Sequence, residues 1–410
     1  MSVIRHGTVI VGASVAGIAA ADALRKDGYE APVRVMDASP VMPHDRPPLS
    51  KQALGSGYDD AKAALRKESH YTDSRIDLLL GRRATALRVS KSGDLEVETG
   101  DGQTFAADEV VLAPGAAPRR LPAESMLPGV HVVRSLPDAV ALRDSLASGG
   151  QVVVAGCGFI GAEVAAAARR RGLDVTVVEM SARPFERLVS ERPAAALTRL
   201  HREHGVEILA GAGVAGVTGK RRAQTVVLTD GRELPADIVV LGLGVVPSVD
   251  WLDGSGVRLA DGIVCDRYGR TSVPGVHAAG DAAAWPDPFT GLPRRVEHWT
   301  TAQQQGTAVG HNIACPGERK PVPAVPYFWS DQHGVRVQSL GWLDHPDEVR
   351  CVYGDWDSPA FAALYRRGDH LTGALGVGAA RQLMRWRPAI ERRTPWAEIA
   401  DGMAATGAAG

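Results

Sequence analysis

Short apolar runs alternate with glycine-rich turns and helical stretches in the first part of the chain. Residues 9–11 have the pattern of a buried strand that enters a turn at Gly12, and an alanine-rich helical stretch follows over about residues 18–25. Residues 33–36 read as a second strand, which ends at Asp37. Strand, turn, helix and strand in this order predict a βαβ unit with parallel strands.

The same order returns in mid-chain. Residues 151–154 predict a strand, residues 156–161 a turn and residues 162–171 a helix. The next strand, residues 175–178, ends at Glu179. Two copies of one nucleotide-binding pattern in a single chain are more informative than either copy alone.

Further strand patterns occur at residues 109–112, 238–241 and 276–279, and strand-like alternation returns near residues 335–340 and 350–353. A chain of 410 residues is too long for one ordinary core. The predicted fold class is therefore α/β, with two Rossmann-like dinucleotide-binding domains and a smaller C-terminal α+β domain.

The mid-chain turn carries the complete dinucleotide-binding pattern of three glycines. Gly156 permits the tight turn, Gly158 lets the backbone approach a pyrophosphate, and Gly161 lets the helix pack on the strand. The phosphates would lie at the helix N-terminus, where free N–H groups favour negative charge. The residues expected to contact NAD(H) in this turn are Gly156, Gly158, Phe159, Ile160 and Gly161.

The acid at the end of the second strand bears on the choice of nucleotide. A carboxylate at Glu179 accepts hydrogen bonds from a ribose diol and repels a 2′-phosphate, so it predicts NADH over NADPH. Arg183 lies four residues further on and would be able to pair with a 2′-phosphate. The strictness of the preference therefore stays open.

The N-terminal turn is a weaker version of the same pattern. It keeps Gly12 and Gly17 but has Ser14 in place of the middle glycine, and Asp37 supplies the terminal acid. The Cβ of Ser14 narrows the space for a pyrophosphate, although a small residue still fits and its hydroxyl is able to donate to a phosphate. This turn is a second candidate dinucleotide site.

Composition and charge exclude several classes of partner. The net charge is −1, which predicts neither nucleic acid nor an anionic membrane as a partner. No apolar run approaches the roughly 20 residues of a membrane-spanning helix, so a cytoplasmic protein is expected. The four cysteines have neither metal-binding nor redox spacing, and no metal site is expected.

Several further motifs occur along the chain, of which RPPLSK at residues 46–51 and PYFWSDQ at residues 326–332 are the most specific. Between them lie an Ala-Pro-Gly crossing at residues 113–115, a GxGxxP loop at residues 242–247 and a Glu-His-Trp segment at residues 297–299. In this order, and over nearly the whole chain, the motifs resemble those of the FAD-dependent NADH:ferredoxin reductases of the putidaredoxin reductase and biphenyl dioxygenase reductase type. The chain departs from many members at Ser14, at Pro114 in place of threonine, and at His333 in place of tyrosine.

The resemblance implies that FAD is bound non-covalently by the N-terminal turn. Asp37 would bind the adenosine ribose, and Asp281, after Gly280, would bind the ribityl or pyrophosphate part. An alternative role for Asp281 is to cap a helix starting near Ala282. The other residues implied near the cofactors are Arg46, Ala113, Pro114, Val296 and Trp299 for FAD and Gly244 for the nicotinamide.

Lys51 and Glu163 are the residues to which the resemblance gives a chemical role. Family likeness places both near the flavin ring and the incoming nicotinamide. A lysine there would stabilise negative charge on the reduced ring, and Glu163 would hold the lysine and touch the carboxamide. The alternative is an ordinary surface salt bridge.

The implied function is transfer of hydride from NADH to FAD and then of single electrons to a 2Fe–2S ferredoxin that serves a haem-thiolate monooxygenase or a Rieske dioxygenase. An NADH oxidase or quinone-type reductase remains possible on the same scaffold, as does a redox-responsive binding protein similar to apoptosis-inducing factor. Monomer and homodimer both stay open. The expected domains are residues 1–118 with 248–318 for FAD, residues 119–247 for NAD(H), and residues 319–410 at the C-terminus.

Overall fold

The computed structural model describes residues 6–322 and 325–405. Contacts divide the chain into two compact units. Unit 1 comprises Met1–Asp45, Ala61–Ala117 and Val246–Ala324. Unit 2 comprises Arg46–Asp60, Pro118–Val245 and Val325–Gly410. The chain passes between the units in strands β8 (Ala116–Pro118) and β17 (Val245–Pro247), among other crossings.

Unit 1 is built on a parallel sheet with the strand order β20-β7-β1-β2-β3. Its strands are β1 (Thr8–Val11), β2 (Val33–Asp37), β3 (Ile76–Leu80), β7 (Glu109–Leu112) and β20 (Val276–Ala278). All four residues of β1 are buried, as expected for the central strand of a sheet that is covered on both faces. The predicted βαβ unit is present, with helix α1 (Val15–Lys26) between β1 and β2.

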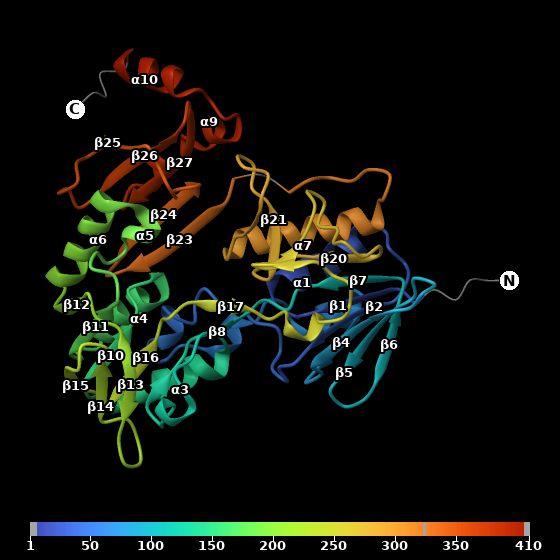
Figure 1. The fold of residues 1–410 in the computed structure, drawn as a ribbon, viewed down its shortest axis with the longest axis horizontal. Helices are drawn as coiled ribbons and strands as arrows, with labels where there is room; N and C mark the ends of the chain where they lie inside the picture. The colour runs from blue at the N-terminus through green and yellow to red at the C-terminus, as the bar shows by residue number, and fades with distance from the viewer. Residues whose placement is uncertain (1–5, 323–324, 406–410) are drawn as a thin grey trace. The chain divides into compact units, whose positions relative to one another are not determined.

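Helix α7 (Trp299–Ala314) packs tightly against α1 (Figure 1). A Cβ atom on Gly306 would lie 2.1 Å from the carbonyl oxygen of Ala16, and one on Gly310 would lie 2.3 Å from that of Ala20. The two backbones therefore touch directly, and the relative register of the helices is fixed by these two glycines.

Two smaller sheets and short helices complete unit 1. The first sheet is antiparallel and consists of β4 (Ala84–Val89), β5 (Leu95–Thr99) and β6 (Thr104–Ala107). It lies on the side of the parallel sheet opposite α1 and α7 (Figure 1). The second consists of β18 (Leu259–Ala260), β19 (Gly262–Val264), β21 (Ala283–Pro286) and β22 (Pro293–Arg295). The short helix α2 (Glu68–Asp73) precedes β3.

Unit 2 repeats the parallel architecture, with the strand order β12-β11-β10-β16-β9. The strands are β9 (Val130–His131), β10 (Val152–Ala155), β11 (Val175–Glu179), β12 (Val206–Ala210) and β16 (Ile238–Leu241). The helices are α3 (Leu136–Ser148), α4 (Phe159–Arg170), α5 (Glu186–Val189) and α6 (Glu191–Glu203). A small antiparallel sheet consists of β13 (Val214–Thr218), β14 (Thr225–Leu228) and β15 (Glu233–Pro235).

An antiparallel sheet of order β23-β24-β27-β26-β25 forms the C-terminal part of unit 2. Its strands are β23 (Tyr327–Gln332), β24 (Val335–Gly341), β25 (Glu348–Tyr353), β26 (Phe361–Arg367) and β27 (His370–Val377). Helices α8 (Ala380–Met384), α9 (Arg387–Glu391) and α10 (Trp396–Ala405) follow it. The predicted fold class, two dinucleotide-binding folds and a C-terminal α+β part, is confirmed.

The C-terminal sheet shares a hydrophobic core with the parallel sheet of unit 2. Phe361, Tyr365 and Leu375 pack in the same cluster as Leu197, and the fully buried Tyr365 hydroxyl donates to the carbonyl oxygen of Val189 at 2.5 Å. The C-terminal sheet and the parallel sheet therefore pack together within unit 2. The predicted domain boundaries at residues 118, 247 and 318 stay a prediction.

Three histidines cluster where the β23–β24 turn meets α6. His201 Nδ1 lies 3.1 Å from His333 Nε2, and the His204 ring stacks on the His333 ring with 4.3 Å between centroids. Burial, reinforced by His201, His204, Arg170 and Arg169, lowers the pKa of His333 to about 3. His333 is therefore neutral in the folded protein over a pH range in which an unfolded chain would protonate it.

We expect this cluster to destabilise the protein in acid. Between the unfolded pKa of about 6.5 and the folded value, the unfolded chain binds the extra proton, so stability falls as the pH falls. At pH 5 the loss is about 1 kcal/mol, allowing for solvent screening of this half-buried ring. His333 has φ +49, which asparagine tolerates, so His333→Asn should reduce the drop in Tm between pH 7 and pH 5. His345→Asn is the matched control, because His345 has a similar φ of +45. An equal effect of both variants would contradict the assignment of the acid sensitivity to His333.

Candidate dinucleotide-binding sites

The surroundings of the three glycines in the mid-chain turn show what a side chain would meet at each position. Gly156 has φ +100, and a Cβ atom there would lie 2.4 Å from the carbonyl oxygen of Gly242. A Cβ atom on Gly161 would lie 2.2 Å from the carbonyl oxygen of Gly156, so α4 packs directly on the end of β10. No atom lies within 4 Å of the corresponding position on Gly158. The turn therefore leaves open space only in front of its middle glycine, where a pyrophosphate would approach.

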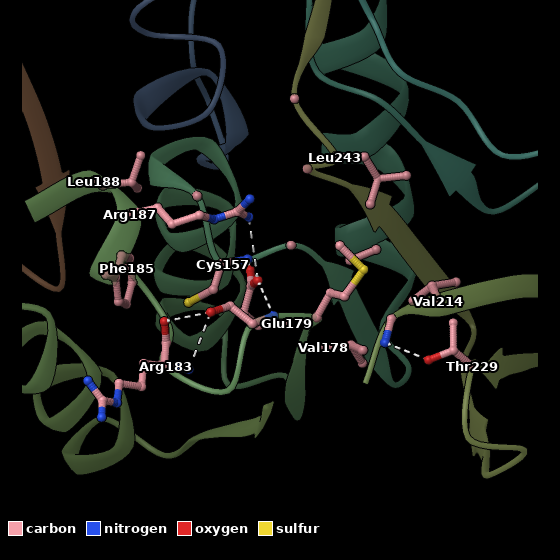
Figure 2. A pocket seen from close by; sticks show the side chains of 18 residues that line it. Cys157, Val178, Glu179, Arg183, Phe185, Arg187, Leu188, Val214, Thr229 and Leu243 are labelled. Atoms are coloured by element: carbon pink, nitrogen blue, oxygen red, sulfur yellow. Dashed lines mark hydrogen bonds and ion pairs between the residues drawn. The ribbon is translucent and has the colours of Figure 1, made fainter. Parts of the chain in front are cut away.

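Glu179 is fixed at the end of β11 by two backbone amides. The Cys157 amide donates to Oε2 and the Ser181 amide to Oε1, both at 2.8 Å. The side chain is 7% exposed, and it lines a cavity of about 530 Å³ above the turn (Figure 2). Gly158, Met180, Leu243 and Gly244 also line this cavity. A cavity that joins a glycine turn to a buried acid has the shape and chemistry of an adenosine diphosphate site.

The arginine nearest to the acid differs from the one that the sequence singled out. Arg183 forms ion pairs with Glu186 at 3.0 Å and Glu191 at 3.3 Å, and its guanidinium points away from Glu179 in Figure 2. Arg187 Nη2 instead lies 3.9 Å from Glu179 Oε1. Both arginines line the cavity. The sequence spacing did not predict that Arg187 lies near Glu179, because the chain turns at Phe185, which has φ +64.

Glu179→Ala is expected to raise the ratio of the specificity constants for NADPH and NADH by tenfold or more. The change removes the repulsion of a 2′-phosphate and frees Arg187, which is 77% exposed, to pair with it. Steady-state kinetics with both nucleotides measure the ratio. The gain should disappear in Glu179→Ala/Arg187→Ala and persist in Glu179→Ala/Arg183→Ala; the reverse pattern would make Arg183 the relevant cation.

The start of α4 presents a large apolar side chain to solvent. Ile160 is 45% exposed, whereas the Phe159 ring packs against Phe328 with 4.4 Å between centroids. Gly244 has φ +84 and lies on the loop after β16. The roles of Phe159, Ile160 and Gly244 in binding NAD(H) stay predictions.

Lys51 and Glu163 form a buried ion pair within unit 2. Lys51 Nζ lies 3.0 Å from Glu163 Oε1, and the two side chains are 8% and 4% exposed. The hydroxyls of Ser50 and Ser330 also donate to the carboxylate, the second at 2.5 Å. Burial raises the pKa of Glu163, and Lys51 and the two hydroxyls oppose that rise. The alternative of a surface salt bridge is excluded, because both groups are removed from water.

The N-terminal turn in unit 1 repeats the geometry of the mid-chain turn. Gly12 has φ +108, and a Cβ atom on Gly17 would lie 1.9 Å from the carbonyl oxygen of Gly12. Ser14 is the N-cap of α1 with φ −92 and ψ −170, close to the φ −82 and ψ 175 of Gly158. Asp37 accepts from the amides of Ala13 at 2.7 Å and Ser39 at 2.8 Å, as Glu179 does from its two amides. The middle position therefore accommodates a Cβ without any change of backbone.

Other residues implied near FAD also lie in unit 1. The Gly280 amide donates to Gln305 Oε1 at 2.8 Å, and Trp299 Nε1 donates to Asp45 Oδ1 at 2.8 Å. The turn packs closely against Ala113, whose carbonyl oxygen would lie 2.0 Å from a Cβ on Gly12. The sequence did not predict Asp45 as the partner of Trp299 or Gln305 as the partner of Gly280. The partners are 254 and 25 residues apart in the sequence, and such separations leave no local pattern.

Some expectations for this region need correction or stay open. No helix starts near Ala282: the chain enters strand β21 at Ala283, so Asp281 does not cap a helix there. Arg46 belongs to unit 2 with Lys51 rather than to unit 1. Binding of FAD by Asp37, Arg46, Pro114, Asp281 and Val296 stays a prediction.

Among residues 6–322 and 325–405, no helix is both long and apolar enough to cross a membrane. Cys157, Cys265, Cys315 and Cys351 are all free thiols. Burial raises the pKa of Cys157 and of Cys265, which makes both weak nucleophiles.

Comparisons with known proteins agree with this geometry. Residues 6–306 match the pyridine nucleotide-disulphide oxidoreductase family, and residues 327–405 match the reductase C-terminal family. Rhodocoxin reductase of Rhodococcus erythropolis is 36% identical over 94% of this chain and 90% of its own length. Putidaredoxin reductase of Pseudomonas putida is 32% identical over 94% of this chain and 92% of its own length.

A solved structure of a covalent putidaredoxin reductase–putidaredoxin complex is 31% identical to this chain. It matches with a TM-score of 0.90 over 95% of this chain and 94% of its own. The chain therefore belongs to the pyridine nucleotide-disulphide oxidoreductase family, and within it to the NADH-dependent ferredoxin reductases with a reductase C-terminal domain.

Proposed function

We propose that this chain transfers electrons from NADH, through a non-covalently bound FAD, to a 2Fe–2S ferredoxin that serves a haem-thiolate monooxygenase or a Rieske dioxygenase. The observation that carries the proposal is the repeated turn, in which an acid at a strand end is held by the amide that follows the first glycine. The repeat occurs once in each unit, at Gly12–Asp37 and at Gly156–Glu179. One copy suits each dinucleotide.

The mid-chain copy supplies the features that NADH requires. The open space at Gly158 admits the pyrophosphate, and the N-terminus of α4 offers its free amides and positive dipole end. Both oxygens of Glu179 accept amide hydrogen bonds and have lone pairs left for a ribose diol. NADH is therefore the proposed nucleotide.

Lys51 and Glu163 are proposed to act on the reacting end of the cofactors. Bound FAD supplies the conversion between two-electron and one-electron transfer. The Lys51 ammonium is held by the buried carboxylate of Glu163 and by the carbonyl oxygen of Pro47. The hydroxyls of Ser50 and Ser330 donate to that carboxylate and so fix its position. A positioned cation of low exposure stabilises developing negative charge more strongly than a solvated one does.

A thiol relay is not part of the proposal. The segment after β2 has Val41, Met42, Pro43 and His44, so it offers no cysteine. Cys157 lies in the mid-chain turn, but its thiol is 3% exposed and its amide serves Glu179. Electrons are therefore proposed to leave for an external acceptor.

The names of the relatives support a small iron–sulfur protein as that acceptor. One solved relative was crystallised in covalent complex with putidaredoxin, and another is the ferredoxin reductase of a cytochrome P450 system from Rhodopseudomonas palustris. A third relative is the reductase component of a chlorobenzene dioxygenase. These names cover both proposed kinds of terminal oxygenase.

The test is steady-state reduction of purified 2Fe–2S ferredoxins from the source organism, followed in a coupled oxygenase assay. At least one ferredoxin should give an NADH-dependent turnover well above that with oxygen or quinones, and NADPH should give a lower specificity constant. Turnover that is fastest with oxygen or a quinone would favour the oxidase or quinone reductase. Slow turnover with every acceptor and a long-lived complex with NAD would favour a redox-responsive binding protein.

A further inference from the structure

A histidine, a cysteine and an aspartate meet at the C-terminal ends of helices α1 and α7 in unit 1. A carboxylate oxygen of Asp27, a ring nitrogen of His311 and the sulfur of Cys315 all lie within 4.8 Å of one another. His311 and Cys315 are four residues apart and so lie on one face at the end of α7, and Asp27 is the C-cap of α1. We propose that these three side chains form a binding site for a divalent transition-metal ion of the zinc type.

The ring of His311 is already oriented as in a metal site. Its Nε2 lies 3.2 Å from the carbonyl oxygen of Glu318, and its Nδ1 lies 2.6 Å from Asp27 Oδ2. A metal-bound histidine commonly donates its other N–H to a backbone carbonyl, and Nε2 is placed to do so here. In the tautomer with the proton on Nε2, Nδ1 and the carboxylate are two acceptors that face one another, and a metal ion fits between them. In the other tautomer, Nδ1–H donates to the carboxylate instead.

The donor set selects the class of metal. Imidazole nitrogen and thiolate sulfur suit Zn²⁺ and Co²⁺, whereas Mg²⁺ and Ca²⁺ prefer sites made of oxygen alone. Three protein ligands leave a fourth tetrahedral position for water. In such a site the ligand atoms are about 3–4 Å apart, so the present spacing requires only small side-chain rotations. On binding, the thiol proton would pass to water, and Nδ1 would bind the metal through its lone pair.

The electrostatics of the helix ends also favour a cation. The C-terminus of a helix carries partial negative charge, and here two helices of 12 and 16 residues end at the same place. Close contact of Gly306 and Gly310 with α1 fixes the spacing between these ends.

The chain after α7 is held firmly against the site. The Asn312 side chain donates to the carbonyl oxygens of Tyr268 and Lys320 and accepts from the Lys320 amide at 2.7 Å. The Cys315 amide donates to the carbonyl oxygen of His311 at 2.8 Å. The three ligands are therefore presented by a rigid support, which lowers the entropic cost of binding a metal.

This site was not expected from the sequence, in which no two cysteines have metal-binding spacing. Cys315 is the only cysteine of the set, and Asp27 lies 284 residues before His311. The three ligands belong to unit 1, whereas the proposed NADH cavity is lined by residues of unit 2. The inference therefore does not rest on the proposed function.

The test is titration of the purified holoprotein with Zn²⁺ by calorimetry and with Co²⁺ by absorption. We expect one equivalent to bind, a rise in Tm with Zn²⁺, and cobalt bands between about 500 and 750 nm that are typical of tetrahedral coordination with a thiolate. Mg²⁺ at the same concentration should neither bind nor compete.

Variants identify the ligands. Cys315→Ser, a conservative change, should abolish the thiolate–cobalt absorption and weaken Zn²⁺ binding at least tenfold. Asp27→Asn should also weaken binding. Cys351→Ser removes a free thiol in unit 2 and should change nothing. The proposal is overturned if Zn²⁺ fails to bind, or if binding survives unchanged in Cys315→Ser and Asp27→Asn.

Discussion

Glu163→Leu is expected to destabilise the protein by about 3–5 kcal/mol, because it leaves the Lys51 ammonium buried without its counter-ion. The two serine hydroxyls that donate to the carboxylate lose their acceptor as well. Chemical denaturation, followed by a signal that reports on unit 2, measures the change in the free energy of unfolding. Asp357→Ala is the matched control: its ion pair with Arg199 has a similar length of 2.7 Å, but Asp357 is 89% exposed, so a loss below about 1 kcal/mol is expected.

The double variant Lys51→Met/Glu163→Leu separates structure from chemistry. Replacing both partners removes the unpaired charge, so most of the stability should return. If the pair serves the reaction, kcat should remain about 100-fold below that of the parent despite the recovered stability. Recovery of both stability and kcat would show that the pair is structural only.

Gly158→Val is expected to weaken NADH binding about 100-fold, or about 2.7 kcal/mol, with little effect on folding. The backbone at Gly158 is extended and nothing lies within 4 Å of its Cβ position, so the fold accepts the side chain and the pyrophosphate meets it. Ser14 shows that this backbone accommodates a Cβ. NADH titration of the oxidised protein measures the dissociation constant, and thermal unfolding measures stability.

Two further substitutions serve as comparisons for Gly158→Val. Gly158→Ala should weaken binding by about tenfold or less, because a methyl group fills less of the space. Gly156→Ala should cost about 2–5 kcal/mol of stability, since its φ is +100 and its Cβ would lie 2.4 Å from a carbonyl oxygen. Unchanged NADH affinity in a folded Gly158→Val protein would place the nucleotide elsewhere.

The sequence predicted those features that depend on local patterns. Both βαβ units were predicted because apolar runs, glycine turns and strand-terminal acids recur in a fixed order. The acids Asp37 and Glu179 lie where the pattern predicts, at the ends of β2 and β11. The three glycines of the mid-chain turn have the distinct steric roles that their spacing suggested.

The missed features depend on long-range packing or on loop conformation. The buried hydrogen bond from Tyr365 to Val189 ties the C-terminal sheet to α5 across 176 residues, and no periodicity reveals it. Arg187 approaches Glu179 after a turn in which Phe185 takes a left-handed conformation, and the sequence pattern does not show this turn. The expected helix near Ala282 is a strand because this segment pairs with β19 and β22.

The central claim is that electrons pass from NADH to a one-electron iron–sulfur acceptor, and stopped-flow reoxidation tests it most directly. The protein is reduced anaerobically with one equivalent of NADH and then mixed with either 2Fe–2S ferredoxin or oxygenated buffer, while the flavin absorbance is followed. Reoxidation by the cognate ferredoxin should be faster than reoxidation by oxygen by at least tenfold. Oxygen that reacts as fast as every ferredoxin of the source organism would contradict the account.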